Sequence, residues 1–197
     1  EMAALPIEPQ TARMLLQAHQ ESVLSEMLVI AAGLSIQDPR EFPTEEKEKA
    51  RQMHSSFVSR ESDYITLLSI WRAYQARWNE LKTENKMRKF CRQHFLSFVR
   101  MREWRDIHHQ LSSILRDSGK YPLKSLQALP VIEARPEESE DREVPNFRLN
   151  RPTKDEPKSK SIFEAGIDYD AIHQALLSGY LNCIARQKDK QQYTSIR

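Results

Sequence analysis

Positively charged side chains are the residues of this sequence most able to bind a ligand, and they concentrate between Lys86 and Lys120. That stretch holds nine Lys and Arg against three Asp and Glu, a local charge balance of +6. Its apolar residues recur at gaps of three and four, so one helical stripe can face a core while cations line the opposite face. Such a surface suits the phosphate backbone of a nucleic acid, although solvated arginines on a helix are also common.

Catalytic chemistry has little support in the sequence. No glycine-rich phosphate loop and no Cys-x-x-Cys motif occurs. His108 and His109 are adjacent, so on a helix they diverge and do not share a metal ion. His94 follows Cys91 by three residues, and a packing role is expected for both. We therefore predict a helical binding module with no catalytic, cofactor-binding or metal-binding residues.

The composition is typical of a polar globular protein. Of the 197 residues, 39% are hydrophobic and 29% charged, the net charge is +2, and only four are glycine, which disfavours a turn-rich β fold. Cys91 and Cys183 are expected as reduced core residues, with a disulfide as the alternative. No apolar run has the length needed to span a bilayer, so a cytoplasmic setting without membrane contact is expected.

Apolar periodicity predicts a mostly α fold, a compact helical bundle with a long irregular insert and a final docking helix. The basic stretch has helical period throughout, and we expect two helices in it that change direction near Val99 to Met101. The other expected helices are Thr11–His19, Ser22–Leu34, Thr44–Phe57, a helix capped by Ser62, and Tyr169–Ala185. Residues 131–161 are proline-rich and charged, which predicts an irregular linker. Tyr193–Arg197 resembles a short strand.

Four segments, taken in order, resemble the C-terminal accessory region of DEAH-box RNA helicases, most closely the bacterial HrpA type. These segments are LPIEPQ with ARMLL at residues 5–16, IAAGLSIQDP at 30–39, SDYITLL at 62–68, and the stretch 95–111 with Arg102, Asp106 and Gln110. The helix around 168–186 resembles the family segment that closes its ratchet-like domain. Three positions depart from the eukaryotic pattern: His94, Val99 and His108 replace Asn, Arg and Arg.

The resemblance implies a domain organisation within a longer protein. Residues 1–10 would be the tail of a winged-helix domain, 11–130 the helical ratchet-like domain, and 131–161 an irregular insert. Residues 162–190 would form the closing helix of the same domain, and 191–197 the start of an oligonucleotide-binding barrel. The ATP and Mg²⁺ sites would lie in motor domains outside this chain.

The resemblance also implies a function, as one non-catalytic wall of a single-stranded RNA channel in an ATP-dependent helicase. The partners would be RNA, bound weakly by this chain alone, and the motor, winged-helix and oligonucleotide-binding domains. The RNA-binding residues that it implies are Ser35, Gln37, Asp38, Arg40, His94 and Arg102. The alternative is a helical protein-interaction scaffold whose basic face binds acidic protein or ribosomal partners.

Overall fold

The computed structural model describes residues 8–121, 123, 166–181, 185–189 and 192–195, and these residues are mostly helical. The α-helices are α1 Pro9–Gln20, α2 Leu24–Leu34, α3 Lys47–His54, α4 Asp63–Leu81, α5 Glu84–Gln93, α6 Phe98–Asp117 and α7 Tyr169–Gly179. A single 3₁₀ turn, η2 Thr44–Glu46, precedes α3. Strands β1 Ala185–Asp189 and β2 Gln192–Ser195 pair as an antiparallel hairpin.

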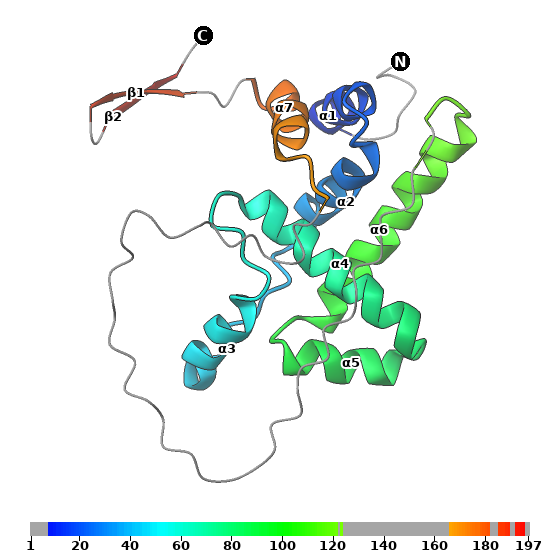
Figure 1. Cartoon of the computed structure of the whole chain (residues 1–197), viewed down its shortest axis with the longest axis vertical. Helices are drawn as coiled ribbons and strands as arrows, with labels where there is room; N and C mark the ends of the chain where they lie inside the picture. Colours follow the sequence, from blue (N-terminus) through cyan, green and yellow to red (C-terminus); the bar gives the residue numbers. More distant parts are fainter. Residues whose placement is uncertain (1–7, 122, 124–165, 182–184, 190–191, 196–197) are drawn as a thin grey trace.

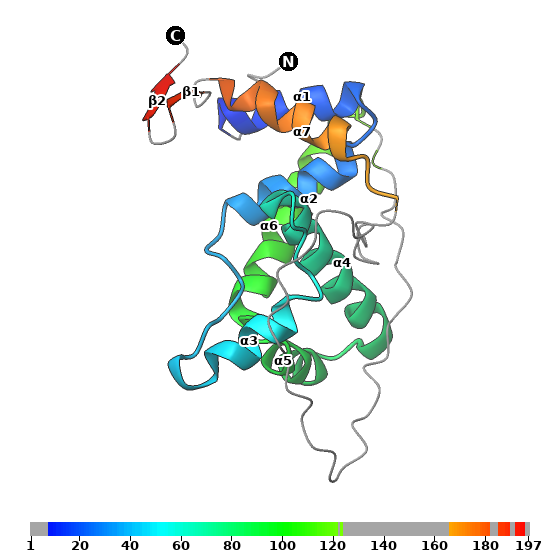
Figure 2. The same cartoon turned by 60° about the vertical axis from the view of Figure 1, so that its left-hand side comes forward.

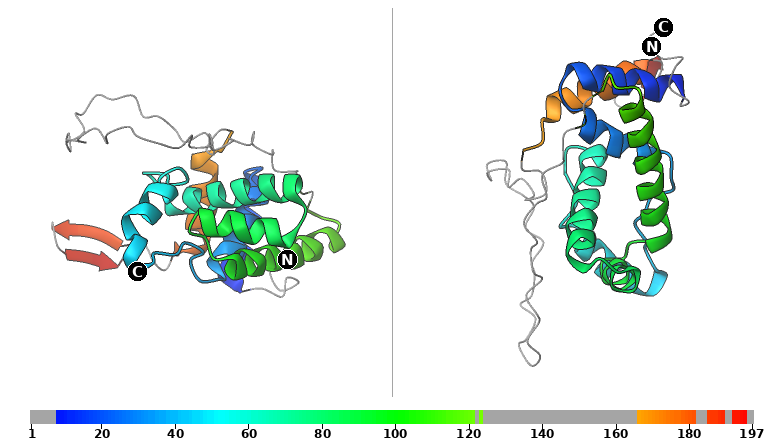
Figure 3. Two further views of the ribbon diagram at one scale, coloured as in Figure 1. Left: turned by 90° about the horizontal axis from the view of Figure 1, so that it is seen from below. Right: turned by 90° about the vertical axis from the view of Figure 1, so that its right-hand side faces the viewer.

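Two long helices, α4 and α6, form the sides of the bundle (Figure 3). Helices α1 and α7 lie together at one end, and α5 closes the other end beside α3 (Figures 1 and 2). Helix α2 lies between these groups and packs on α1, α4 and α6, which explains why it is buried on almost every side. The chain therefore has one continuous core that runs along the bundle.

Two tryptophans form the centre of this core. Trp71 on α4 and Trp104 on α6 are 1% and 0% exposed, and their ring centroids lie 5.2 Å apart. The indole Nε1–H of Trp104 donates to the Val29 carbonyl oxygen at 2.9 Å, so its one polar group is satisfied. Phe95 is also buried and Phe98 is half-buried, so these aromatic residues have packing roles.

Local signals explain where several helices begin. Pro9 occupies the first turn of α1, where its missing N–H costs nothing. Ser62 caps α4 as predicted, because its Oγ accepts a hydrogen bond from the Ile65 backbone N–H at 3.4 Å. The predicted helix from Thr44 is confirmed in outline, with η2 as its first turn and α3 ending at His54.

The break in the basic stretch comes earlier than predicted. The chain changes direction at residues 94–97, and Val99 to Met101 lie inside α6. Phe95 has a φ of 52°, in the left-handed region, and this ends α5. No glycine marks the position, and the backbone there is held by hydrogen bonds to a distant loop, so helical periodicity alone missed it.

The final helix docks on the bundle as predicted, but it is shorter than expected. Helix α7 ends at Gly179, whereas we predicted a helix to Ala185 and a closing segment to residue 190, and β1 occupies that stretch instead. Arg13 Nε donates to the Ser178 carbonyl oxygen at 2.9 Å, and the Ser62 hydroxyl pairs with His173 Nε2 at 2.9 Å. These contacts join α7 to α1 and to the start of α4.

Several predictions fall on residues outside the described part of the chain. These include the irregular insert at 131–161, most of the winged-helix tail at 1–10, and Cys183. Cys91 is a buried free thiol, which agrees with the prediction that it is a reduced core residue. Tyr193 lies in β2, so a strand does form there.

Gly33 provides a test of the core. A Cβ atom at this position would lie 2.7 Å from Cζ2 of Trp104, and that ring is fully buried and hydrogen-bonded. Gly33→Ala should therefore lower the free energy of unfolding by about 1–3 kcal/mol, as overpacking does, in a denaturant titration. Gly119→Asn is the control, because Gly119 has open space around it and Asn tolerates its φ of 65°. Equal stability of Gly33→Ala and the unaltered chain would contradict the packing described.

Candidate nucleic-acid interface

The loop at residues 35–43, which we call the α2–η2 loop, is fastened to the junction between α5 and α6. The Glu41 backbone N–H donates to the Phe95 carbonyl oxygen at 2.8 Å, and the Ser97 N–H donates to the Pro39 carbonyl oxygen at 2.8 Å. Arg40 and Leu96 form an isolated antiparallel bridge between these two bonds. A loop far from the basic helices in sequence thus becomes part of the same surface.

His54 of α3 adds a side-chain contact to this junction. Its Nε2 lies 3.0 Å from the Phe95 carbonyl oxygen, and since a carbonyl only accepts, Nε2 carries the proton. The ring is 3% exposed, and it packs edge-on against Phe42 with a centroid distance of 5.0 Å. Burial lowers the pKa of His54, and the nearby Arg40 charge acts in the same direction. The imidazole is therefore a neutral structural group.

Asp38 and Arg40 form an ion pair within the loop. Arg40 Nη2 lies 2.6 Å from Asp38 Oδ2, Arg40 Nε lies 3.0 Å from Oδ1, and the Arg40 backbone N–H donates to Oδ1 at 2.9 Å. Partial burial alone would raise the pKa of Asp38, but the hydrogen bonds from Arg40 outweigh it and hold that pKa below its ordinary value. The same pairing raises the pKa of Arg40. Both groups stay charged and largely neutralise each other.

Arg100 of α6 is a site residue that the sequence analysis did not select. Its Nη1 donates to the Asp38 carbonyl oxygen at 2.8 Å, and its Nη2 donates to Gln37 Oε1 at 3.0 Å. The planar guanidinium thus holds the loop backbone and one loop side chain at once. Gln37 is exposed, and because its Oε1 accepts from Arg100, its amide N–H groups remain available as donors.

Ser35 ends α2 and is exposed. Its hydroxyl donates to the Ala31 carbonyl oxygen at 3.0 Å, and the residue caps the C-terminal end of the helix. The lone pairs of Oγ stay available to a ligand that donates a hydrogen bond. Ser35, Gln37, Asp38 and Arg40 therefore all lie in the α2–η2 loop.

His94 and Arg102, the other two predicted RNA-binding residues, lie outside the α2–η2 loop. His94 follows the last residue of α5, whereas Arg102 lies on α6. Its Nδ1–H donates to the Phe90 carbonyl oxygen at 2.9 Å, and burial lowers its pKa. The ring lies between Phe90 and Phe57, which is the packing arrangement expected for this histidine.

Arg102 points to solvent on α6. Arg100 and Arg102 are two positions apart, and such residues are separated by about 200° around the helix axis. Arg102 therefore faces away from the side on which Arg100 contacts the loop. Among the described residues Arg102 has no ion-pair partner, and Asp106 pairs with Arg105 at 3.5 Å instead. Arg102 is thus a free cation on the far flank of the same helix. Both arginines lie in the basic stretch, and only the helix phase fixed by packing distinguishes them.

The described part of the chain holds no cluster of three or more potential metal ligands. Within the same residues, no helix has both the length and the apolar character needed to cross a membrane.

Comparison with known proteins assigns this fold. Residues 8–97 match the family model of the helicase-associated domain (HA2), ratchet-like. The whole chain is 31% identical to the ATP-dependent RNA helicase HrpA homolog of Haemophilus influenzae and 29% identical to the ATP-dependent RNA helicase HrpA of Escherichia coli. It is 32% identical over 58% of its length to the human probable ATP-dependent RNA helicase DHX35.

Residues 8–97 belong to the helicase-associated, ratchet-like family, and the whole chain is similar to part of the HrpA-type ATP-dependent RNA helicases, because those matches cover all of it. It spans 12% of the length of the two HrpA relatives and 15% of the human relative. The resemblance seen in the sequence motifs is thereby confirmed.

One buried and two half-buried histidines predict how stability depends on pH. Burial lowers the pKa of His54 and His94, and burial together with Arg116 and His109 lowers that of His108 to about 4. The unfolded chain therefore takes up protons first, below its ordinary histidine pKa of about 6.5. Stability should be full above that pH and should fall steadily as the pH drops toward 4.

Thermal melts followed by circular dichroism across this window would measure the effect. The His108 ring lies 4.8 Å from the Trp71 ring, measured between centroids, and His108→Phe keeps a ring at this position. This variant should lose less stability at acid pH, because it removes the group that takes up a proton. His109→Phe, at the exposed neighbouring position, is the control and should change the loss of stability much less, because His109 is the smallest of the three causes that lower the pKa of His108. A melting midpoint that does not move between neutral and mildly acid pH would refute the assignment.

Proposed function

We propose that this chain is a non-catalytic RNA-channel domain of an ATP-dependent DEAH-box helicase. It forms one wall of the tunnel for single-stranded RNA, and it helps couple ATP hydrolysis to RNA translocation and unwinding. ATP and Mg²⁺ bind to motor domains outside this chain, which supplies no phosphate loop of its own. Its protein partners are those motor domains and the winged-helix and oligonucleotide-binding domains of the same helicase, in the cytoplasm.

The α2–η2 loop is the observation that carries this proposal. It presents polar groups to solvent, and its backbone is fixed by the Phe95 and Ser97 hydrogen bonds and by Arg100. A loop that is already ordered loses little conformational entropy when a strand passes along it. A wall that must meet each incoming nucleotide in the same way needs this kind of rigidity.

The chemistry of the loop suits a strand that moves. Gln37 offers amide donors to phosphate or base oxygens, and Ser35 offers an acceptor to a ribose hydroxyl. The Asp38–Arg40 pair carries little net charge, so the loop does not hold phosphates tightly. Weak, polar contacts let RNA advance, whereas a cluster of unpaired cations at the same point would trap it.

Exposed apolar side chains support contacts with other domains. Val99 on α6 is 70% exposed, and Leu177 and Leu181 at the end of α7 are 53% and 51% exposed. Large apolar groups in water favour burial against a partner. In this proposal the partners are the neighbouring helicase domains. The alternative of a scaffold for acidic proteins would use the basic helices instead.

The proposal predicts a separation of activities in a full-length helicase that contains this chain. Arg40→Glu combined with Arg102→Glu should weaken RNA binding by about tenfold, which corresponds to roughly 1.4 kcal/mol. RNA-stimulated ATP hydrolysis and unwinding should fall with it, whereas basal ATP hydrolysis should persist. Both activities and the melting midpoint would be measured on the same preparation.

Lys49→Glu combined with Arg51→Glu on α3 is the matched control. It reverses two charges as well, at exposed positions that pair with Glu46 and Glu48. This variant should keep RNA stimulation. If the Arg40 and Arg102 variant stays folded and unwinds RNA like the unaltered helicase, these residues are not channel contacts.

A further inference from the structure

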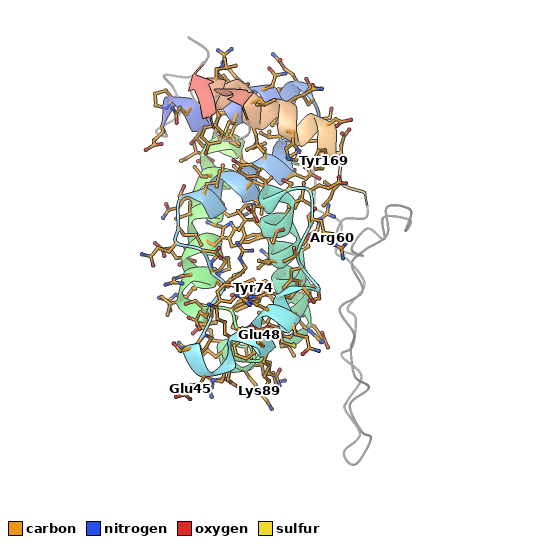
Figure 4. All side chains as sticks on the ribbon, turned by 90° about the vertical axis from the view of Figure 1, so that its left-hand side faces the viewer. Glu45, Glu48, Arg60, Tyr74, Lys89 and Tyr169 are labelled. Carbon is orange, nitrogen blue, oxygen red and sulfur yellow. The ribbon has the colours of Figure 1, made fainter. Side chains whose placement is uncertain are left out.

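The outer face of α5 is a second cationic surface, separate from the α2–η2 loop. Lys86, Lys89 and Arg92 define this surface, which we call the α5 basic face, and all three side chains are exposed. Met87, Phe90 and Cys91 occupy the opposite, buried side of the same helix. Figure 4 shows Lys89 at the end of the bundle remote from Tyr169 on α7. The three cations extend over about 9 Å of helix.

The cations of this face lack the ion-pair partners that several cations on α3 and α4 have. On α3, Lys49 and Arg51 pair with glutamates one turn away, and on α4, Arg77 pairs with Glu80 at 2.8 Å. The only acid on α5 is Glu84, and it lies 3.9 Å from Arg88. Arg88 also covers the Phe98 ring, 4.4 Å from its centroid. Among the described residues the α5 basic face therefore has no ion pair.

The arrangement opposes helix stability. Lys86 lies in the first turn of α5, where the helix dipole disfavours a positive charge. Lys86, Lys89 and Arg92 follow at intervals of three, and like charges at this spacing repel each other. Glu84 is the one acid in this first turn, and it lies beside Arg88 and not beside a cation of the α5 basic face. Charges that cost stability indicate a ligand that compensates them.

The α5 basic face is charged and has no exposed apolar anchor, and this indicates which class of ligand it binds. Protein interfaces depend on apolar or aromatic anchors, and none of the large exposed apolar side chains of the described residues lies on α5. A phosphate backbone needs no anchor, because counterion release at each phosphate supplies the binding free energy. The absence of exposed aromatics on this face also excludes base stacking there as the source of affinity. These features favour a nucleic-acid backbone over an acidic protein.

We infer that the α5 basic face binds the phosphate backbone of single-stranded RNA, without sequence preference, as an electrostatic continuation of the path past the α2–η2 loop. The inference rests on the proposed function, because it extends the RNA contact of that loop to a second surface. The two surfaces have different tasks. The loop meets the strand through rigid polar groups, and the α5 basic face retains it through unpaired charge.

The test uses the full chain and a fluorescent oligouridylate of about 20 nucleotides, long enough to exceed the roughly 4–16 nucleotides of a single-domain site. Lys86→Gln, Lys89→Gln and Arg92→Gln together should lower affinity about tenfold at low salt. Loss of three phosphate contacts should also reduce the slope of log affinity against log salt by about 2. Lys89→Gln alone should reduce that slope by about 0.7, and it serves if the triple variant does not fold.

The control is Lys47→Gln with Lys49→Gln and Arg51→Gln on α3, which removes the same net charge and should leave the slope unchanged. A Ser35→Ala and Gln37→Ala variant tests the loop separately. If that variant binds normally while the α5 variant does not, the proposed function fails and the α5 site stands. If the α5 variant keeps the original affinity and slope, the inference is wrong. Displacement of the RNA by polyglutamate at equal charge concentration would also overturn it, in favour of an acidic protein ligand.

Discussion

The carbonyl oxygen of Phe95 is the point on which this surface depends. It accepts one hydrogen bond from the Glu41 backbone and one from His54, so the α2–η2 loop and α3 are both fastened to the turn between α5 and α6. Phe95 reaches this geometry with a φ of 52°, and a left-handed conformation costs a bulky residue on the order of 1–3 kcal/mol. Burial of its ring and the two hydrogen bonds offset that cost. Without this turn, α5 and α6 would continue as one helix and the loop would lose its backbone hydrogen bonds to Phe95 and Ser97.

The sequence predicted those features that arise from local or periodic signals. The Ser62 cap follows from residue type at a helix start, and the packing of Trp71 and Trp104 follows from helical spacing. The break at Phe95 has no glycine or proline to announce it, and it exists because of hydrogen bonds to residues more than 50 positions away. The end of α7 was also missed, since the apolar spacing continues beyond Gly179 while the chain enters a hairpin. Tertiary pairing overrode periodicity at both places.

The candidate site shows the same division. The family resemblance selected Ser35, Gln37, Asp38 and Arg40, and the structure places all four in one loop. They did not identify Arg100, although it makes the contacts that orient Gln37 and the loop backbone. Arg100 and Arg102 are the same residue type, two positions apart, and only the packing of Met101 and Trp104 decides which one turns toward the loop. The charge of a helix can be read from the sequence, but the side on which each charge acts depends on the packed structure.

The central claim is that the α2–η2 loop, held rigid by the Phe95 turn and by Arg100, meets single-stranded RNA. Backbone amide chemical shifts, followed by NMR while oligouridylate is added to the chain, test this most directly. The account predicts saturable shifts at the amides of Gln37, Asp38 and Arg40 and at the Arg100 side-chain Nε–H. It also predicts that the Glu41 amide stays protected from exchange, because its hydrogen bond to Phe95 is retained. Saturable binding with shifts elsewhere on the bundle and none in this loop would contradict the claim.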